Sequence, residues 1–432
     1  MVNNLKQLLV QAQAAHDAAD WSLLVQYLQQ LILAENSTHP EIVNPEQLLE
    51  LAISILEQGD FQERWEIAKV LTRLGNIAIL PLIEILEDED AETELRWYAA
   101  RTLGEFQHPD VISSLLDLLK TSEDEELKAI AAAALGQMGT VAITKLAELL
   151  TEENTRLLAV RSLSYIHSRE TITPLLSVVQ DSQAVVRTTA LEALSSFHDE
   201  RVPPLLLNAL DDVAVIVRRT AVLGLGFRPD LCTELDLVTK LQPRLYDLNL
   251  EVCCAAAIAL SRMRCDDAAK HLFEVLTSPH TPQPLQLESI RALIWVETLS
   301  GLEYLQKALD QNTSETVWQE IVTVLGRVQK PQLTTPAAEI LMDMLRSQHP
   351  AIKIASIKSA IALSLGQLGN IQAIKPLILL LADPDQVVRL HAIAALKKLD
   401  EEVAYQQLQE LASNATLTPD LQQGIAIALA EW

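Results

Sequence analysis

Eight basic residues occupy the same position in successive copies of a repeated sequence pattern, and a row of basic side chains can bind carboxylates. They are Arg64, Arg96, Lys128, Arg156, Arg187, Arg218, Lys358 and Arg389. In four copies an aspartate stands six residues before the base, at Asp90, Asp181, Asp212 and Asp383. Such an aspartate can cap a helix and pair with an arginine of the same or a neighbouring copy. We therefore expect a structural ladder of ion pairs, with a clamp for a substrate as the alternative.

The basic series is interrupted between residues 227 and 336, and aromatic side chains gather in the same segment. The positions equivalent to the base hold Cys253, Ser289 and Trp318 there, and Gln422 in the last copy. An interrupted pattern marks either a functional site or drift of the repeat. Large aromatic side chains supply much of the energy of protein interfaces, and arginine pairs well with anionic groups. The candidate partner-binding residues are Trp295, Tyr304, Trp318, Arg187, Arg218 and Arg219.

Histidine and cysteine are not arranged as a shared metal or redox site. His108, His167 and His198 each follow an expected second helix, so the packing distance between helices separates them by roughly 10 Å, too far to share one ion. Their expected role is at a helix C-terminus, where the helix dipole favours positive charge. Cys253 and Cys254 lie in an Ala-rich apolar segment, which favours a buried structural role over redox chemistry or covalent attachment of a ligand. We expect neither a metal nor a cofactor.

The overall charge limits the classes of partner. The chain of 432 residues has a net charge of −25 and no run rich in lysine or arginine, which argues against nucleic acid. Its start lacks the pattern of a signal peptide, and apolar runs are interrupted before about 18 residues, so no membrane span is expected. Four cysteines without a C-x-x-C pair indicate free thiols and a cytoplasmic protein. Acidic runs such as 87–92 and 122–126 form either a solvated edge or a docking edge for a basic partner.

The elements that position these residues are pairs of short helices. Within residues 364–399, one helix is expected over 372–381 and a second over 386–399. Apolar residues recur there at the three- and four-residue steps of one helical face, and neither helix is long enough to be stable alone. Each second helix ends at an apolar anchor residue, with a small or apolar residue four positions earlier. The anchors are Leu71, Leu103, Leu135, Leu163, Leu194, Leu225, Leu260, Val296, Leu325, Leu365, Leu396 and Leu429. Their mean spacing of about 32 residues predicts a solenoid of helix pairs.

The ends and the middle of the chain depart from this pattern. Residues 1–45 are expected to form an N-terminal helical cap, with two helices broken near 16–20 and a linker punctuated by Pro40 and Pro45. Residues 46–432 are expected to form the solenoid, in which 226–336 are drifted middle units.

Three segments carry a resemblance to a known family: VVRLHAIAALKKL (387–399), VVRTTALEALSSF (185–197) and IVRRTAVLGLGF (216–227). They resemble HEAT repeats, in particular the short HEAT-like repeats first named from phycobilisome (phycobilin) lyases. The resemblance covers roughly 47–431 and is strongest over 65–226 and 363–400. It implies an all-α, right-handed α-solenoid of about twelve two-helix HEAT-like repeats, whose second helices line a concave, partner-binding face.

Two functions follow from these observations. The first is a non-catalytic scaffold or adaptor that binds a protein client along the concave face, with the aromatic candidates as anchors. No pattern in the sequence assembles a nucleophile, a base and an orienting group, so catalysis is not expected. As the alternative, the resemblance implies a phycobilin-lyase-like chaperone that attaches bilins to phycobiliproteins or detaches them. The bilin propionates would then pair with Arg161, Arg187, Arg218 or Arg219.

Overall fold

In the computed structural model, residues 2–35, 44–414 and 416–432 are described. They form α-helices joined by turns and short 3-10 helices, and these residues contain no strand. The predicted all-α class is therefore confirmed. Most of the predicted linker, residues 36–43 with Pro40, lies outside the described residues. The chain divides into two compact units, Met1–His198 and Asp199–Trp432.

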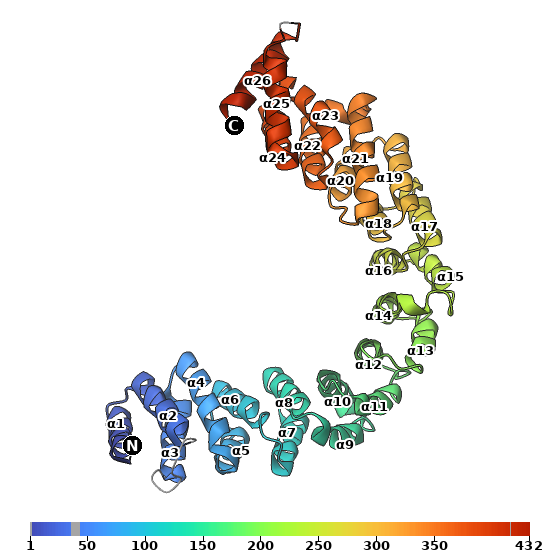
Figure 1. Cartoon of the computed structure of the whole chain (residues 1–432). Coiled ribbons are helices and arrows are strands. Elements are labelled where there is room, and N and C mark those ends of the chain that lie inside the picture. Colours follow the sequence, from blue (N-terminus) through green and yellow to red (C-terminus); the bar gives the residue numbers. More distant parts are fainter. Residues whose placement is uncertain (1, 36–43, 415) are drawn as a thin grey trace. The chain divides into compact units, whose positions relative to one another are not determined.

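The first unit is a succession of helix pairs (Figure 1). Its first helices are α1 (Val2–Asp17), α3 (Pro45–Gln58), α5 (Ile79–Glu87), α7 (Pro109–Thr121), α9 (Thr140–Leu149) and α11 (Ile172–Leu176), with short turns η1 (Gly75–Ala78) and η2 (Arg169–Thr171). Its second helices are α2 (Trp21–Glu35), α4 (Phe61–Leu74), α6 (Thr93–Leu103), α8 (Glu125–Gln137), α10 (Glu153–Tyr165) and α12 (Ala184–Ser195). Each second helix packs on the next, from α2 through α12, so the second helices form one continuous row.

The second unit repeats this arrangement. Its first helices are α13 (Val202–Ala209), α15 (Leu237–Leu241), α17 (Asp266–Thr277), α19 (Leu299–Gln311), α21 (Pro331–Arg346), α23 (Ile374–Leu379) and α25 (Glu401–Ala412). Its second helices are α14 (Val215–Gly226), α16 (Leu250–Ser261), α18 (Gln283–Trp295), α20 (Glu315–Leu325), α22 (Ala355–Leu368), α24 (Gln386–Leu399) and α26 (Pro419–Ala430). The 3-10 turns are η3 (Pro229–Leu231), η4 (Gln242–Tyr246), η5 (Pro350–Lys353), η6 (Ile371–Ala373) and η7 (Leu380–Ala382). The row runs from α14 to α24, and α26 packs on η7.

Local sequence explains where the helices begin. Asp60 and Glu63 form a capping box at α4, in which each carboxylate accepts a hydrogen bond from the other residue's backbone N–H. Asp385 caps α24, whose bounds are those predicted for the second helix of the 364–399 segment. The first helix of that segment is shorter than predicted, because its ends tighten into η6 and η7 around the α-helical α23.

The anchor residues form the spine of the core. Eleven of the twelve are fully buried, and only Leu429, in the C-terminal helix pair, is partly exposed. All twelve residues four positions earlier are buried as well, including Ala99, Ala256 and Ile425. The prediction that neighbouring second helices cover one another's apolar sides is therefore confirmed within each unit.

A glycine directly after the anchor brings neighbouring second helices close together. A Cβ added at Gly366 would lie 2.9 Å from both Cα and Cβ of Ala395, and one at Gly226 would lie 3.0 Å from the same atoms of Ala259. Gly104 meets Ala134 in the same way in the first unit. Since real Cβ atoms do not approach a Cα this closely, an additional methyl group at these positions would force the helices apart.

Replacing Gly366 by alanine has two effects of opposite sign on the free energy of unfolding. Alanine favours a helix over glycine by about 1 kcal/mol. The clash with the backbone of α24 is expected to cost about 1–3 kcal/mol, because the core cannot take up the added volume. We expect Gly366→Ala to lower the thermal melting temperature, measured by circular dichroism.

A control on the same helix is Leu363→Ala, because Leu363 is 47% exposed and faces away from that contact. The free energy of unfolding of this variant should lie within about 0.5 kcal/mol of the wild-type value, so its melting temperature should change little. An equal or higher melting temperature for Gly366→Ala would contradict the close approach.

Candidate functional site

The basic ladder is built from hydrogen bonds to the loops between paired helices. Nη1 of Arg218 donates to the carbonyl oxygens of Asp212 (2.9 Å) and Val213 (3.2 Å). Nη1 of Arg389 donates to the carbonyls of Asp383 (2.7 Å) and Pro384 (2.9 Å) in the same way. Each loop thus satisfies its carbonyl groups with a side chain from the helix that follows.

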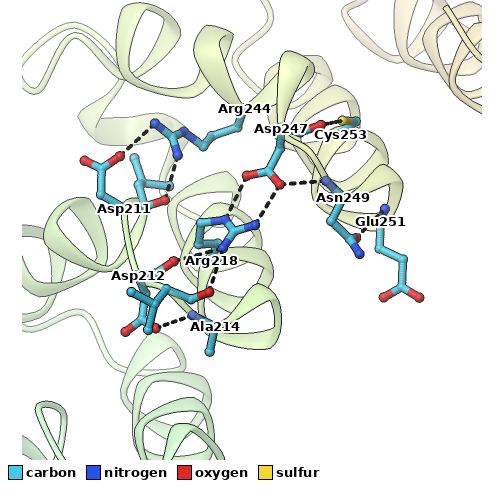
Figure 2. Close-up of polar contacts among 11 residues, drawn as sticks. Asp211, Asp212, Ala214, Arg218, Arg244, Asp247, Asn249, Glu251 and Cys253 are labelled. Carbon is cyan, nitrogen blue, oxygen red and sulfur yellow. Dashed lines mark hydrogen bonds and ion pairs between the residues drawn. The ribbon is translucent and has the colours of Figure 1, made fainter.

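Arg218 and other bases of the series also reach a carboxylate of the next helix pair. Figure 2 shows Arg218 donating from Nε and Nη2 to the two carboxylate oxygens of Asp247, each at 2.8 Å. Arg156 binds Asp181 at 2.6 Å, and Lys358 binds Asp383. The side chains of Arg218 and Asp247 are only 14% and 5% exposed, so this pair is removed from solvent. Hydrogen bonds from Arg218 hold the pKa of Asp247 below its ordinary value, and the same bonds raise the pKa of Arg218. At Arg156, Arg218 and Lys358 these contacts form the predicted ladder between neighbouring copies. Lys128 departs from it, because it pairs with Glu125 of its own helix.

The interruption of the ladder has a structural explanation. Sγ of Cys253, at a base position, donates to the carbonyl of Asp247 at 3.2 Å (Figure 2). Nε1 of Trp318, at another, donates to the carbonyl of Leu309 at 3.2 Å. Cys253 therefore replaces the arginine as a donor to the preceding loop, whereas Trp318 donates to the last turn of α19, the first helix of its own pair. Both side chains have a structural role, which favours drift of the repeat at these two positions.

Asp247 itself was missed by the sequence prediction, which required a base in the same copy. It stands six residues before Cys253, as Asp212 stands before Arg218. That spacing was the signal that would have identified it as a ladder residue.

The six candidate partner-binding residues lie in different environments. Trp295 is 66% exposed, whereas Trp318 is 8% exposed and its ring meets His349 edge-on at 5.4 Å. Tyr304 is half-buried and stacks on Phe273 with 4.7 Å between ring centroids.

The three arginines among them differ as well. Arg187 donates to the carbonyls of Asp181 and Ser182, and Arg218 is held by Asp247. Arg219 is exposed and lies 3.9 Å from Glu251. Trp295 is therefore the candidate with the largest accessible apolar surface.

Trp295 borders a cavity of about 530 Å³ in the second unit. The buried side chains of Val324, Val328 and Leu333 form its apolar wall. The bases Arg291, Arg327 and Lys330 line it, with Glu297 as the acidic residue. The cavity is contributed by the C-terminal ends of α18 and α20, the start of α21 and Gln367 of α22.

The cavity is held in place by a close helix contact. Oγ of Ser364 on α22 donates to the carbonyl of Val322 on α20 at 3.1 Å. A Cβ at Gly326 would lie 2.4 Å from that Oγ, so the small residue at this position allows the two helices to meet. The end of α20 and the loop that carries Arg327 are thereby fixed beside α22.

The histidines and cysteines make other contacts. His108 caps the N-terminus of α7, where its Nδ1 accepts from the N–H of Asp110 at 3.3 Å; the predicted role at a helix C-terminus was wrong for this residue. Burial raises the pKa of the Cys253 and Cys254 thiols, which disfavours the reactive thiolate. In the described part of the chain, no three His, Cys, Asp or Glu side chains are grouped as a metal site would require. Among the described helices, none has the length and apolar character needed to cross a bilayer.

Comparison with known proteins identifies the repeat. A family model described as HEAT repeats matches residues 45–136, 79–156, 144–226 and 355–430. A search of curated proteins finds no match to the sequence.

Solved structures show the same kind of solenoid. They include Kap95p, whose binding induces the switch loops of RanGDP to adopt the GTP-bound conformation (14% identity, TM-score 0.60, 89% of this chain and 60% of Kap95p). Yeast importin-β (Kap95p) alone is also similar (12% identity, TM-score 0.51, 100% of this chain and 67% of the other). Importin-β in an ammonium sulfate condition is a third (13% identity, TM-score 0.51, 97% and 64%). The chain thus spans about 60% of the length of the first of these proteins.

The ladder predicts that Asp247→Asn destabilises the second unit. The change leaves the largely buried Arg218 without its charged partner, so we expect a loss of about 1.5–3 kcal/mol in the free energy of unfolding at neutral pH. Because the pKa of Asp247 is lowered in the fold, the stabilisation is present above its ordinary value of 3.8 and is lost as pH falls below it. Urea unfolding at several pH values measures both effects.

Glu251→Gln is the matched control, since it makes the same carboxyl-to-amide change opposite the neighbouring arginine of α14, at the start of α16. The Arg219–Glu251 pair is exposed, at 49% and 75%, and the atoms are 3.9 Å apart. Its loss should change stability by less than about 0.5 kcal/mol. Equal effects of the two variants would contradict the structural role of Asp247.

Proposed function

Because the chain belongs to the HEAT-repeat family, whose model matches 45–226 and 355–430, we propose that it is a non-catalytic scaffold or adaptor that binds a protein client along its second helices. The observation that carries this proposal is the exposure of Trp295 beside an open cavity on that row. An exposed tryptophan has no stabilising role comparable to that of the buried anchors. Large aromatic residues at the border of a pocket are typical of interface anchors.

The proposal assigns a role to each part of the chain. We propose that the pair α1–α2, which packs on α3 and α4, is the N-terminal cap and covers the apolar side of the first repeat. The drifted segment 226–336 then contributes part of the binding surface through Trp295. The second-helix row is proposed to be the concave face. The four free cysteines suit the cytoplasm.

The bilin-handling alternative uses arginines that have other partners. Arg218 binds both carboxylate oxygens of Asp247, and Arg187 donates to two loop carbonyls. Using either for a propionate would require breaking largely buried contacts, which costs more than an exposed ion pair returns. Arg161 and Arg219 are exposed, and two surface arginines alone make a weak site for a tetrapyrrole. We therefore favour a protein client over a bilin.

Mixing the purified chain with phycocyanobilin tests that preference. We expect the absorption spectrum of the pigment to stay unchanged at protein concentrations well above micromolar. A phycobiliprotein without bilin is added to the same mixture as a second probe, and the absorption spectrum of the pigment is recorded again. An induced spectral shift that disappears in Arg161→Ala would replace the scaffold proposal by the bilin-handling function.

Client capture by the immobilised chain tests the scaffold function. We expect a protein from the extract of its own cells to be retained, and retention to fall at least about tenfold in Trp295→Ala, as for an interface hot spot. The melting temperature should not change, because the side chain is 66% exposed.

Tyr165→Ala is the control for capture, because Tyr165 is 58% exposed at the end of another second helix, α10. It should retain the client within about twofold, as peripheral interface positions do. Capture that is unaffected by Trp295→Ala would remove Trp295 as the anchor.

A further inference from the structure

The cavity at Trp295 combines an apolar wall with unneutralised positive charge. We propose that it is a docking pocket for an acidic segment of a protein client, with one aromatic or aliphatic side chain of that segment inserted against the wall. This inference rests on the proposed scaffold function and names the chemistry of the client.

The wall provides a place for an apolar side chain. Val324, Val328 and Leu333 lie at its base with exposures of 3%, 9% and 5%, and the indole of Trp295 stands at its edge. A volume of about 530 Å³ accepts a large side chain and part of its backbone. Insertion would cover the tryptophan, whose exposure has no explanation in the isolated chain.

Three basic residues and one acidic residue line the pocket, and they differ in the partners that they bind. Arg291 is paired with Glu320 at 2.6 Å and with Glu288 at 3.4 Å. Glu297, the acid that lines the pocket, is paired with Arg264 outside it at 3.6 Å. The negative charge of Glu297 is therefore partly neutralised by Arg264, which reduces its repulsion of an incoming carboxylate.

Two bases remain without a carboxylate partner. The side chain of Arg327 is exposed, and neither a hydrogen bond nor an ion pair involves its guanidinium among residues 2–35, 44–414 and 416–432. Lys330 donates to the carbonyl of Glu297 at 3.0 Å, which leaves its charge unneutralised. Lys330 immediately precedes α21, whose N-terminal dipole adds to the positive side.

The net negative charge of the chain favours an acidic peptide over a nucleic acid as the ligand of the pocket. A polyphosphate needs many basic contacts along its length. Here two bases without a carboxylate partner lie in a chain of net charge −25, which repels a long polyanion. A short acidic segment places its carboxylates on Arg327 and Lys330 and its apolar side chain on the wall.

Fluorescence polarisation with labelled peptides tests the pocket in the full-length chain. The probe carries glutamates on both sides of one phenylalanine. The first comparison peptide has lysines for the glutamates, and the second has serine for the phenylalanine. We expect the probe to bind at least about tenfold more tightly than either, and more weakly as salt rises from about 50 to about 300 mM.

Charge reversal locates the binding. Arg327→Glu should weaken binding of the probe at least about tenfold, while Arg219→Glu, the same change at an exposed arginine outside the pocket, should have an effect below about twofold. Trp295→Ser should weaken it similarly, with unchanged melting temperatures throughout. Equal effects of the two arginine variants, tight binding of the lysine peptide, or preferred binding of a single-stranded oligonucleotide would each overturn the proposal.

Competition separates this inference from the scaffold function. If the pocket is the docking site, an excess of the acidic peptide displaces the captured client. A client that stays bound would overturn the pocket and leave the scaffold intact. Peptide binding with no client retained would instead overturn the scaffold function.

Discussion

The structure depends on one packing constraint: an isolated helix pair cannot bury its own apolar side. The anchor residues show how this is met, since Leu103 and Leu225 are fully buried between neighbouring second helices. The small residue four positions earlier and the glycine after the anchor set the distance between those helices. At Gly366 the approach leaves no room for a methyl group, so the spacing of the row is determined by residue size. The distances between exposed side chains on neighbouring second helices therefore depend on this spacing.

The ladder satisfies the other requirement of stacked pairs, which is that loop carbonyls find donors. Arg218 meets it within its own copy and uses its remaining nitrogens to bind Asp247 of the next. Cys253 donates to the preceding loop and Trp318 to the last turn of α19, but neither side chain has a charge with which to bind a carboxylate of the next copy. Within the interrupted segment an ion pair between copies is made from another position, since Arg291 of α18 binds Glu320 of α20 at 2.6 Å. Drift in that column is tolerated because the anchors, not the ladder, hold the helices together.

The repeat, the helix pairs and the anchors were predictable because each depends on short-range periodicity. The second helix 386–399 was predicted with the bounds of α24. Residue type alone did not distinguish Trp318 from Trp295, since both lie in second helices. The difference is register: Trp318 is at the base position and donates to the last turn of α19, while Trp295 directly precedes the anchor Val296 and is exposed. The cavity was not predictable, because stacking brings its walls together from α18, α20 and α21.

Stacking also decides which charges remain available to a partner. Composition describes an acidic chain that repels anions, yet the pairing of each side chain depends on its neighbours in the row. Arg291 and Glu297 have partners on adjacent segments, whereas the guanidinium of Arg327, which follows Gly326 at the end of α20, has no ion pair among the described residues. In a strongly acidic protein such a base is the point of least repulsion for a carboxylate. In the proposed docking, specificity for an acidic segment arises from geometry that leaves the guanidinium of Arg327 without an ion pair in the same cavity as an exposed indole.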